Sequence, residues 1–65
     1  MNIPVEFYNR HGKMLKKADF ISKQYAMEPI ERHMAAHPSN IVKVAGNLCF
    51  TLHQAEKRID SRVAS

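Results

Sequence analysis

The sequence contains a single cysteine, Cys49, so no disulfide can form within the chain. A lone thiol is more typical of a protein from a reducing cytosol than of a secreted disulfide scaffold. No apolar run approaches the roughly 20 residues that a membrane-spanning helix needs. The N-terminal residues lack the basic and then apolar pattern of a signal peptide. These absences predict a soluble, cytoplasmic protein that does not enter a membrane.

The sequence also lacks the signatures of an enzyme. It has no glycine-rich phosphate loop, no paired carboxylates with an obvious cleft and no convincing order of Ser, His and Asp. Cys49 has no basic flank or helix N-terminus that would clearly activate it, so an inert thiol is the better interpretation. We therefore expect no enzymatic activity and no cofactor.

The length and the charge of the chain limit its class. A chain of 65 residues forms one small domain, which we assign to residues 1–65. Its ten Lys and Arg residues outnumber its six Asp and Glu residues, for a formal net charge of +4. A small basic domain attracts polyanions, and nucleic acid is the commonest of these in a cell. The alternative is that the charge only keeps the protein soluble.

The first half of the chain predicts a strand and two helices. Val5 and Phe7 alternate with polar residues as in a short strand, and residues 9–12 have the composition of a turn. Apolar residues at helical spacing predict a helix over residues 17–24: Leu15, Ala18, Ile21 and Tyr25. Pro29 suits the first turn of a second helix, residues 29–36, and should end the first helix before it. No internal repeat is evident.

The second half of the chain predicts a β-hairpin that leads into a helix. A three-residue loop at residues 45–47 would place the apolar side chains of both strands, 42–44 and 48–50, on one face. With this register Cys49 faces away from the core. Thr51 and Gln54 form a capping box for a helix over residues 52–62. The apolar stripe of that helix consists of Leu52, Ala55, Ile59 and Val63.

Two segments resemble a known family. LKKADFISKQYAMEPIERHM (residues 15–34) is similar to the first helix, turn and recognition helix of the excisionase and MerR-like winged helix-turn-helix DNA-binding domains. VKVAGNLCFTLHQAEKRI (residues 42–59) is similar to their wing hairpin and closing helix. The resemblance implies a small α+β fold with a short N-terminal strand, a helix-turn-helix, a β-hairpin wing and a C-terminal helix.

The resemblance also implies a function and partners. The chain would be an excisionase-like recombination directionality factor or a transcriptional regulator of a mobile element. Its partner would be double-stranded DNA, together with an integrase or further copies of the chain on that DNA. The predicted helix 29–36 would enter the major groove, and the wing would lie along the minor groove or the backbone. The implied DNA-binding residues are Lys16, Lys17, Lys23, Glu31, Arg32, His33, Lys43 and Asn47.

Each of these residues also has a structural interpretation. The lysines suit phosphate contacts, but equally an ordinary solvated surface. Arg32 suits a contact to guanine, or an ion pair with Glu28 one helical turn away. Asn47 fits the tight turn better than a base contact, because Asn tolerates left-handed backbone angles. Four residues could in principle hold zinc, although solvated histidines are the better interpretation and we expect no metal: His33, His37, Cys49 and His53.

A second function belongs to another class. The chain could use the winged-helix shape as a protein-binding inhibitor or adaptor without contacting DNA. The positions of the bases separate the two hypotheses. A shared surface for Arg32, Lys43 and the lysines of residues 16–23 favours DNA binding, whereas scattered bases favour the adaptor.

Overall fold

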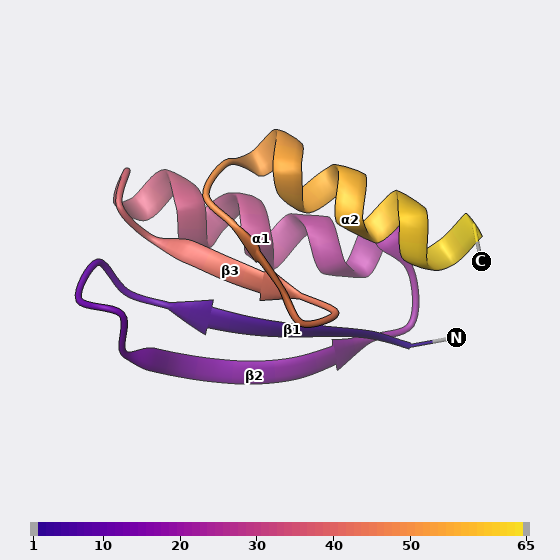
Figure 1. Cartoon of the computed structure of the whole chain (residues 1–65), viewed down its shortest axis with the longest axis horizontal. Helices are drawn as coiled ribbons and strands as arrows, with labels where there is room; N and C mark the ends of the chain where they lie inside the picture. The colour runs from indigo at the N-terminus through magenta and orange to yellow at the C-terminus, as the bar shows by residue number, and fades with distance from the viewer. Residues whose placement is uncertain (1, 65) are drawn as a thin grey trace.

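The computed structural model describes residues 2–64 and shows a sheet covered on one face by helices. The element order is β1 (Ile3–Tyr8), β2 (Met14–Phe20), α1 (Lys23–Ala36), β3 (Ile41–Val44), β4 (Asn47–Cys49) and α2 (Leu52–Ala64). The strands form one antiparallel sheet in the order β2-β1-β3-β4. Both helices lie on the same face of the sheet, and its other face is open (Figure 1). The chain is therefore a small α+β domain, but the winged helix-turn-helix arrangement is not confirmed.

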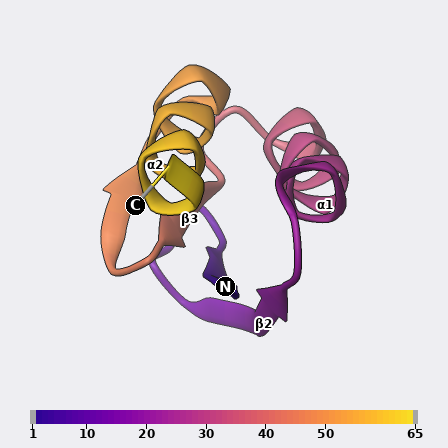
Figure 2. The ribbon, with the colours of Figure 1, turned by 90° about the vertical axis from the view of Figure 1, so that its right-hand side faces the viewer.

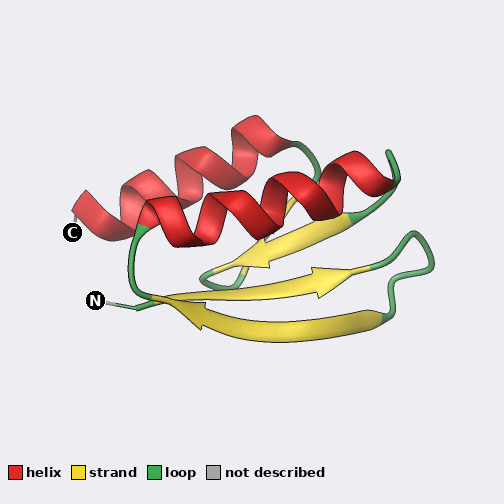
Figure 3. Ribbon diagram, turned by 180° about the vertical axis from the view of Figure 1, so that it is seen from behind, coloured by secondary structure: helices red, strands yellow, loops and turns green. Residues whose placement is uncertain are grey.

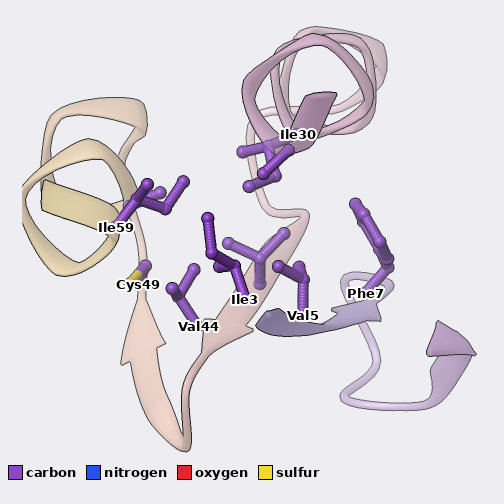
Figure 4. Packing of buried hydrophobic residues seen from close by; sticks show 10 residues of the cluster. Ile3, Val5, Phe7, Ile30, Val44, Cys49 and Ile59 are labelled. Carbon is purple, nitrogen blue, oxygen red and sulfur yellow. The ribbon is translucent and has the colours of Figure 1, made fainter. Parts of the chain in front are cut away.

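The core lies between the sheet and the two helices (Figure 4). The central strand β1 alternates buried and half-buried residues, and Val5 pairs with Val44 of β3. Ile30 of α1 and Ile59 of α2 pack onto the strands and are fully buried. The core consists of Ile3, Val5, Phe7, Ala26, Ile30, Val42, Val44, Cys49, Ala55 and Ile59.

The fold consists of two similar halves, β1-β2-α1 and β3-β4-α2. Each half is an antiparallel hairpin followed by a helix. The first strands, β1 and β3, pair at the centre of the sheet, and the second strands, β2 and β4, form its two edges (Figure 2). Ser22 caps α1 and Thr51 caps α2 through side-chain oxygens. No repeat was evident in the sequence because the two hairpins differ in length and few residues match.

The predicted helix over residues 17–24 is wrong, because residues 14–20 form strand β2. Ala18 and Phe20 stand opposite Val5 and Ile3 of β1, so the true period is that of a strand. The helical spacing was misleading, since Leu15 and Ile21 are 56% and 71% exposed. Long-range pairing with β1 overrides the local helical pattern.

The second predicted helix, residues 29–36, is only the C-terminal part of α1. This helix starts at Lys23 and continues through Pro29 without a break. Pro29 has no N–H for the carbonyl of Tyr25, which lies one helical turn earlier. The packing of Ala26 and Ile30 against the sheet holds the helix together despite this loss. The described residues therefore contain no helix-turn-helix.

The predicted register of the second hairpin is also wrong. Only Ala45 and Gly46 separate the strands, and Val42 pairs with Cys49. Both loop residues have positive φ, 49° and 83°, as a type I′ turn requires. The N–H of Ala45 donates to the carbonyl of Pro4 at 2.8 Å, which holds this non-glycine residue in place. As a result Cys49 points into the core rather than away from it.

The predicted strand at Val5, the turn and the C-terminal helix are confirmed. The side chain of Asn9 stabilises the first turn, because its Oδ1 accepts from the N–H groups of His11 and Lys13. At α2 the N–H of Gln54 donates to Thr51 Oγ1 at 3.1 Å. The Gln54 side chain accepts from the N–H of Phe50, one residue before the cap, at 2.7 Å. The capping box is thus present in a slightly extended form.

Candidate functional site

One cavity lies between the edge strand β2 and helix α1. It has a volume of about 280 Å³. The strand supplies one side of the cavity, the helix supplies the other, and β1 supplies the floor. Figure 3 shows β2 as the outermost strand on this side of the sheet. The lining residues are Phe7, Leu15, Lys16, Pro29, Arg32 and His33.

A β-bulge places Leu15 at this cavity. Phe7 pairs with Lys16 and Tyr8 pairs with Met14, so Leu15 has no partner in β1. Such an extra residue bends a strand and changes the direction of a side chain. The side chain of Leu15 is more than half exposed at the mouth of the cavity. The site therefore offers an apolar surface that no other part of the described chain covers.

The floor of the cavity is fixed by Phe7 and His33. Phe7 is nearly fully buried, and the ring of His33 meets it edge-on at 5.3 Å between centroids. His33 Nε2 lies 2.8 Å from the carbonyl oxygen of Tyr8 and 3.2 Å from that of Ile41. His33 thus joins α1 to the two central strands. Its half-buried ring lines a protein cavity instead of projecting from a recognition helix.

The rim of the cavity is cationic. Lys16 Nζ stands 5.8 Å from the centroid of the Phe7 ring, and no carboxylate of residues 2–64 pairs with it. Arg32 Nη1 donates to Glu28 Oε1 at 2.9 Å, the pairing considered from the sequence. Both partners of this pair are exposed, so the pair contributes little stability and leaves Arg32 accessible to a ligand.

The other predicted lysines lie elsewhere on the molecule. Lys17 and Lys43 both stand opposite Glu6, in β2 and β3, and these three residues belong to the open face of the sheet. Lys17 Nζ is 4.0 Å from Glu6 Oε2. Lys43 Nζ lies 5.8 Å from the centroid of the Tyr8 ring. The hydrogen bond from Tyr8 to Glu6 raises the pKa of the phenol above its usual value.

Lys23 is engaged between the two helices. Its Nζ lies 2.8 Å from Asp60 Oδ1 and 3.0 Å from Glu56 Oε2. These hydrogen bonds, the one to Asp60 first, raise the pKa of the Lys23 ammonium group. The predicted bases therefore occupy three separate places, namely the β2–α1 cavity, the open face and the helix–helix contact. They do not share one surface.

The remaining predicted residues lie in different parts of the fold. Asn47 stabilises its turn, because Nδ2 donates to the carbonyls of Val44 and Ala45. This agrees with the interpretation that the sequence favoured. Glu31 is an exposed residue of α1. The four zinc candidates are not brought together, since residues 2–64 contain no cluster of three or more metal ligands. Burial raises the pKa of the Cys49 thiol, which donates to the carbonyl of Asn47.

Sequence reasoning missed most of the cavity. Phe7 was assigned to a strand, Leu15 to the apolar pattern of a helix and Pro29 to the start of another helix. Their proximity around one cavity was therefore not predicted. A strand interpretation of residues 14–20 would have indicated a free edge there, but their helical spacing concealed it.

A second cavity lies at the opposite edge of the sheet, between β4 and α2. Its volume is about 340 Å³. Leu48 of β4 lines it together with side chains of the facing helix: Gln54, Lys57, Arg58 and Ser61. Each half of the fold thus carries a cavity between its edge strand and its helix.

Comparison of the chain with protein-family models, curated proteins and solved structures finds no match. Function must therefore be argued from the geometry of the chain itself. Neither α1 nor α2 is long and apolar enough to cross a membrane.

Proposed function

We propose that the protein is a small, non-catalytic binding module that takes up an extended segment of another protein along β2. The observation that supports this proposal is the free edge of a seven-residue strand next to the β2–α1 cavity. A segment that adds to a sheet edge gains main-chain hydrogen bonds, and its alternate side chains enter neighbouring pockets. The site has both of these features.

The edge of β2 supplies the main-chain part of the site. Alternate residues of β2 direct their N–H and C=O groups away from β1. No other strand of residues 2–64 pairs with them. An incoming strand would pair with these groups from about Lys16 to Phe20, beyond the bulge at Leu15. The cavity would then receive one apolar side chain of that strand over Phe7.

The charge of β2 selects the partner. Two copies of β2 paired edge to edge would bring Lys16 and Lys17 of both copies together, and lysines on an edge strand oppose such pairing. An acidic segment would instead find Lys16 and Arg32 at the rim of the cavity. We therefore assign the site to a partner segment in which acidic residues alternate with apolar residues.

DNA binding is the second candidate, as an excisionase-like factor or a regulator of a mobile element. The net charge of +4 supports it. The β3–β4 hairpin followed by α2 also keeps the order of a wing and its closing helix, with Lys43 on the hairpin. The protein-binding function is favoured because the predicted bases lie on separate surfaces and because the described residues contain no helix-turn-helix.

An NMR titration tests the proposal. The amide resonances of the labelled protein are followed while a short peptide of alternating glutamate and valine is added, with a lysine and valine peptide as control. We expect shifts along β2 and around Arg32 that Lys16→Glu weakens. Lys13→Glu, the same charge change in the first turn, should leave them intact. Shifts that are absent from β2, or equal in the two variants, would refute the proposal.

A salt series with random-sequence duplex DNA tests the second candidate. Binding measured by fluorescence anisotropy should fall steeply with salt if phosphates are neutralised. A double variant, Arg32→Glu with Lys43→Glu, should abolish it. DNA binding of this kind, together with no response to the acidic peptide, would replace the proposed function by the second candidate.

A further inference from the structure

We infer that the cavity between β4 and α2 is a second, separate site for an acidic segment, so that one domain holds two segments at once. The kind of partner rests on the proposed function, but the site itself has its own residues. It shares no lining residue with the β2–α1 cavity.

The charges of α2 are sorted between its two sides. Glu56 and Asp60 turn toward α1, where Lys23 binds both of them. Lys57 and Arg58 line the cavity beside β4. No carboxylate of the described residues forms an ion pair with either of these bases. The two acids of α2 thus have a partner within the protein, and the two bases remain for an external anion.

The strand side of the cavity adds an apolar contact. Leu48 is half exposed although it belongs to a strand, and it lines the cavity. One exposed leucine therefore lies beside Lys57 and Arg58. An apolar side chain flanked by carboxylates complements this arrangement.

The two cavities occupy equivalent places in the two halves. Starting from the capping residues Ser22 and Thr51, Pro29 of α1 corresponds to Arg58 of α2, and Arg32 corresponds to Ser61. All four line their own cavity. The same hairpin-and-helix unit therefore forms a cavity twice, and each cavity is lined by two basic residues, Lys16 and Arg32 in the first and Lys57 and Arg58 in the second.

The two sites should differ in how they bind. β2 offers the stretch from Lys16 to Phe20 for main-chain pairing, whereas the whole of β4 has three residues. Binding at β4 must depend more on charge, so it should weaken more with salt. Because β2 and β4 are the opposite edges of the sheet, two segments would not collide. A domain of this kind joins two acidic segments, from one partner or from two.

The same peptide titration tests the inference when it is followed at both edges. We expect a second group of shifts at Leu48 and Arg58, in addition to those along β2. The variant Lys57→Glu should weaken binding at Leu48 by about tenfold, which corresponds to ~1.4 kcal/mol. It should leave the affinity measured at Lys16 unchanged. Lys13→Glu is the matched control, and the unperturbed amides of β1 show that each variant is folded.

Each outcome separates the two proposals. Shifts at β2 alone overturn the second site and leave the proposed function standing. Shifts at Leu48 and Arg58 alone overturn the proposed function and support the second site. Shifts at Leu48 that survive Lys57→Glu unchanged, or that only duplex DNA produces, overturn the assignment of an acidic protein segment to this cavity.

Discussion

Ala26 and Ala55 hold the same position in the two halves of the fold. The N–H of each donates, at 3.1 Å, to the carbonyl of the residue that caps its helix, Ser22 or Thr51. Both alanines are fully buried, and each lies four residues before a fully buried isoleucine. An alanine at this position lets the helix approach the sheet closely, so that the isoleucine reaches the central strands. The core is therefore built twice with the same two residue types.

This equivalence predicts matched effects of core truncation. Ile30→Val and Ile59→Val should each lower the free energy of unfolding by about 1 kcal/mol, since each removes one buried methylene group. Urea denaturation followed by circular dichroism measures both. Val63→Ala serves as control, because Val63 is about half exposed and should change stability little. If the loss of unfolding free energy differs severalfold between the two variants, the halves are not energetically equivalent.

The two helix caps should contribute unequally to the free energy of unfolding. Thr51 Oγ1 accepts from Gln54 at 3.1 Å, and Gln54 also reaches back to the Phe50 N–H. Ser22 Oγ accepts from Tyr25 at a longer 3.4 Å. We expect Thr51→Ala to cost about 1 kcal/mol of unfolding free energy, and Ser22→Ala to cost less. A double-mutant cycle of Thr51→Ala with Gln54→Ala should show coupling, and independent effects would contradict a shared cap.

Local sequence features predicted the parts of the fold that local interactions determine. The capping box at Thr51 and the turn at Asn9 are examples, because their donors and acceptors lie within a few residues. Strand β2 could not be predicted in this way. Its helical spacing is accidental, and its conformation comes from pairing with β1, to which Ala18 and Phe20 contribute. The free edge of β2, and with it the candidate site, depended on that pairing.

The predicted register of the β3–β4 hairpin was wrong for a related physical reason. The predicted register put Leu48 and Phe50 on the core face with Val42 and Val44, but Cys49 pairs with Val42 and occupies the core instead. The contact between Ala45 N–H and the Pro4 carbonyl joins segments that are distant in sequence and fixes the two-residue turn. The exposed leucine that results is the one that lines the second cavity.

The position of Cys49 predicts an unreactive thiol. The side chain is fully buried, and burial raises its pKa, so the reactive thiolate is disfavoured as well as inaccessible. A thiol-specific chromogenic disulfide reagent should label Cys49 slowly in the native protein and rapidly in urea. Ile59→Val should raise the native rate about fivefold for a loss of about 1 kcal/mol, because the population of the unfolded state depends exponentially on stability. Fast labelling of the native protein would show that the sulfur is accessible.

The ion pairs of Lys23 predict a pH-dependent contribution to the contact between α1 and α2. Lys23→Gln should lower the urea midpoint, whereas Lys57→Gln should not, because no carboxylate of the described residues pairs with Lys57.

The folded-state pKa of Lys23 is raised above its ordinary value of 10.5. Its contribution is therefore fully present below that value and is lost as the pH rises through the folded-state pKa. The difference between wild type and Lys23→Gln should accordingly be constant near neutral pH and shrink in strong alkali. It should also shrink with added salt, because the charges are exposed. A difference that persists in both high salt and strong alkali would mean that Lys23 acts through the packing of its methylene groups rather than through Asp60 and Glu56.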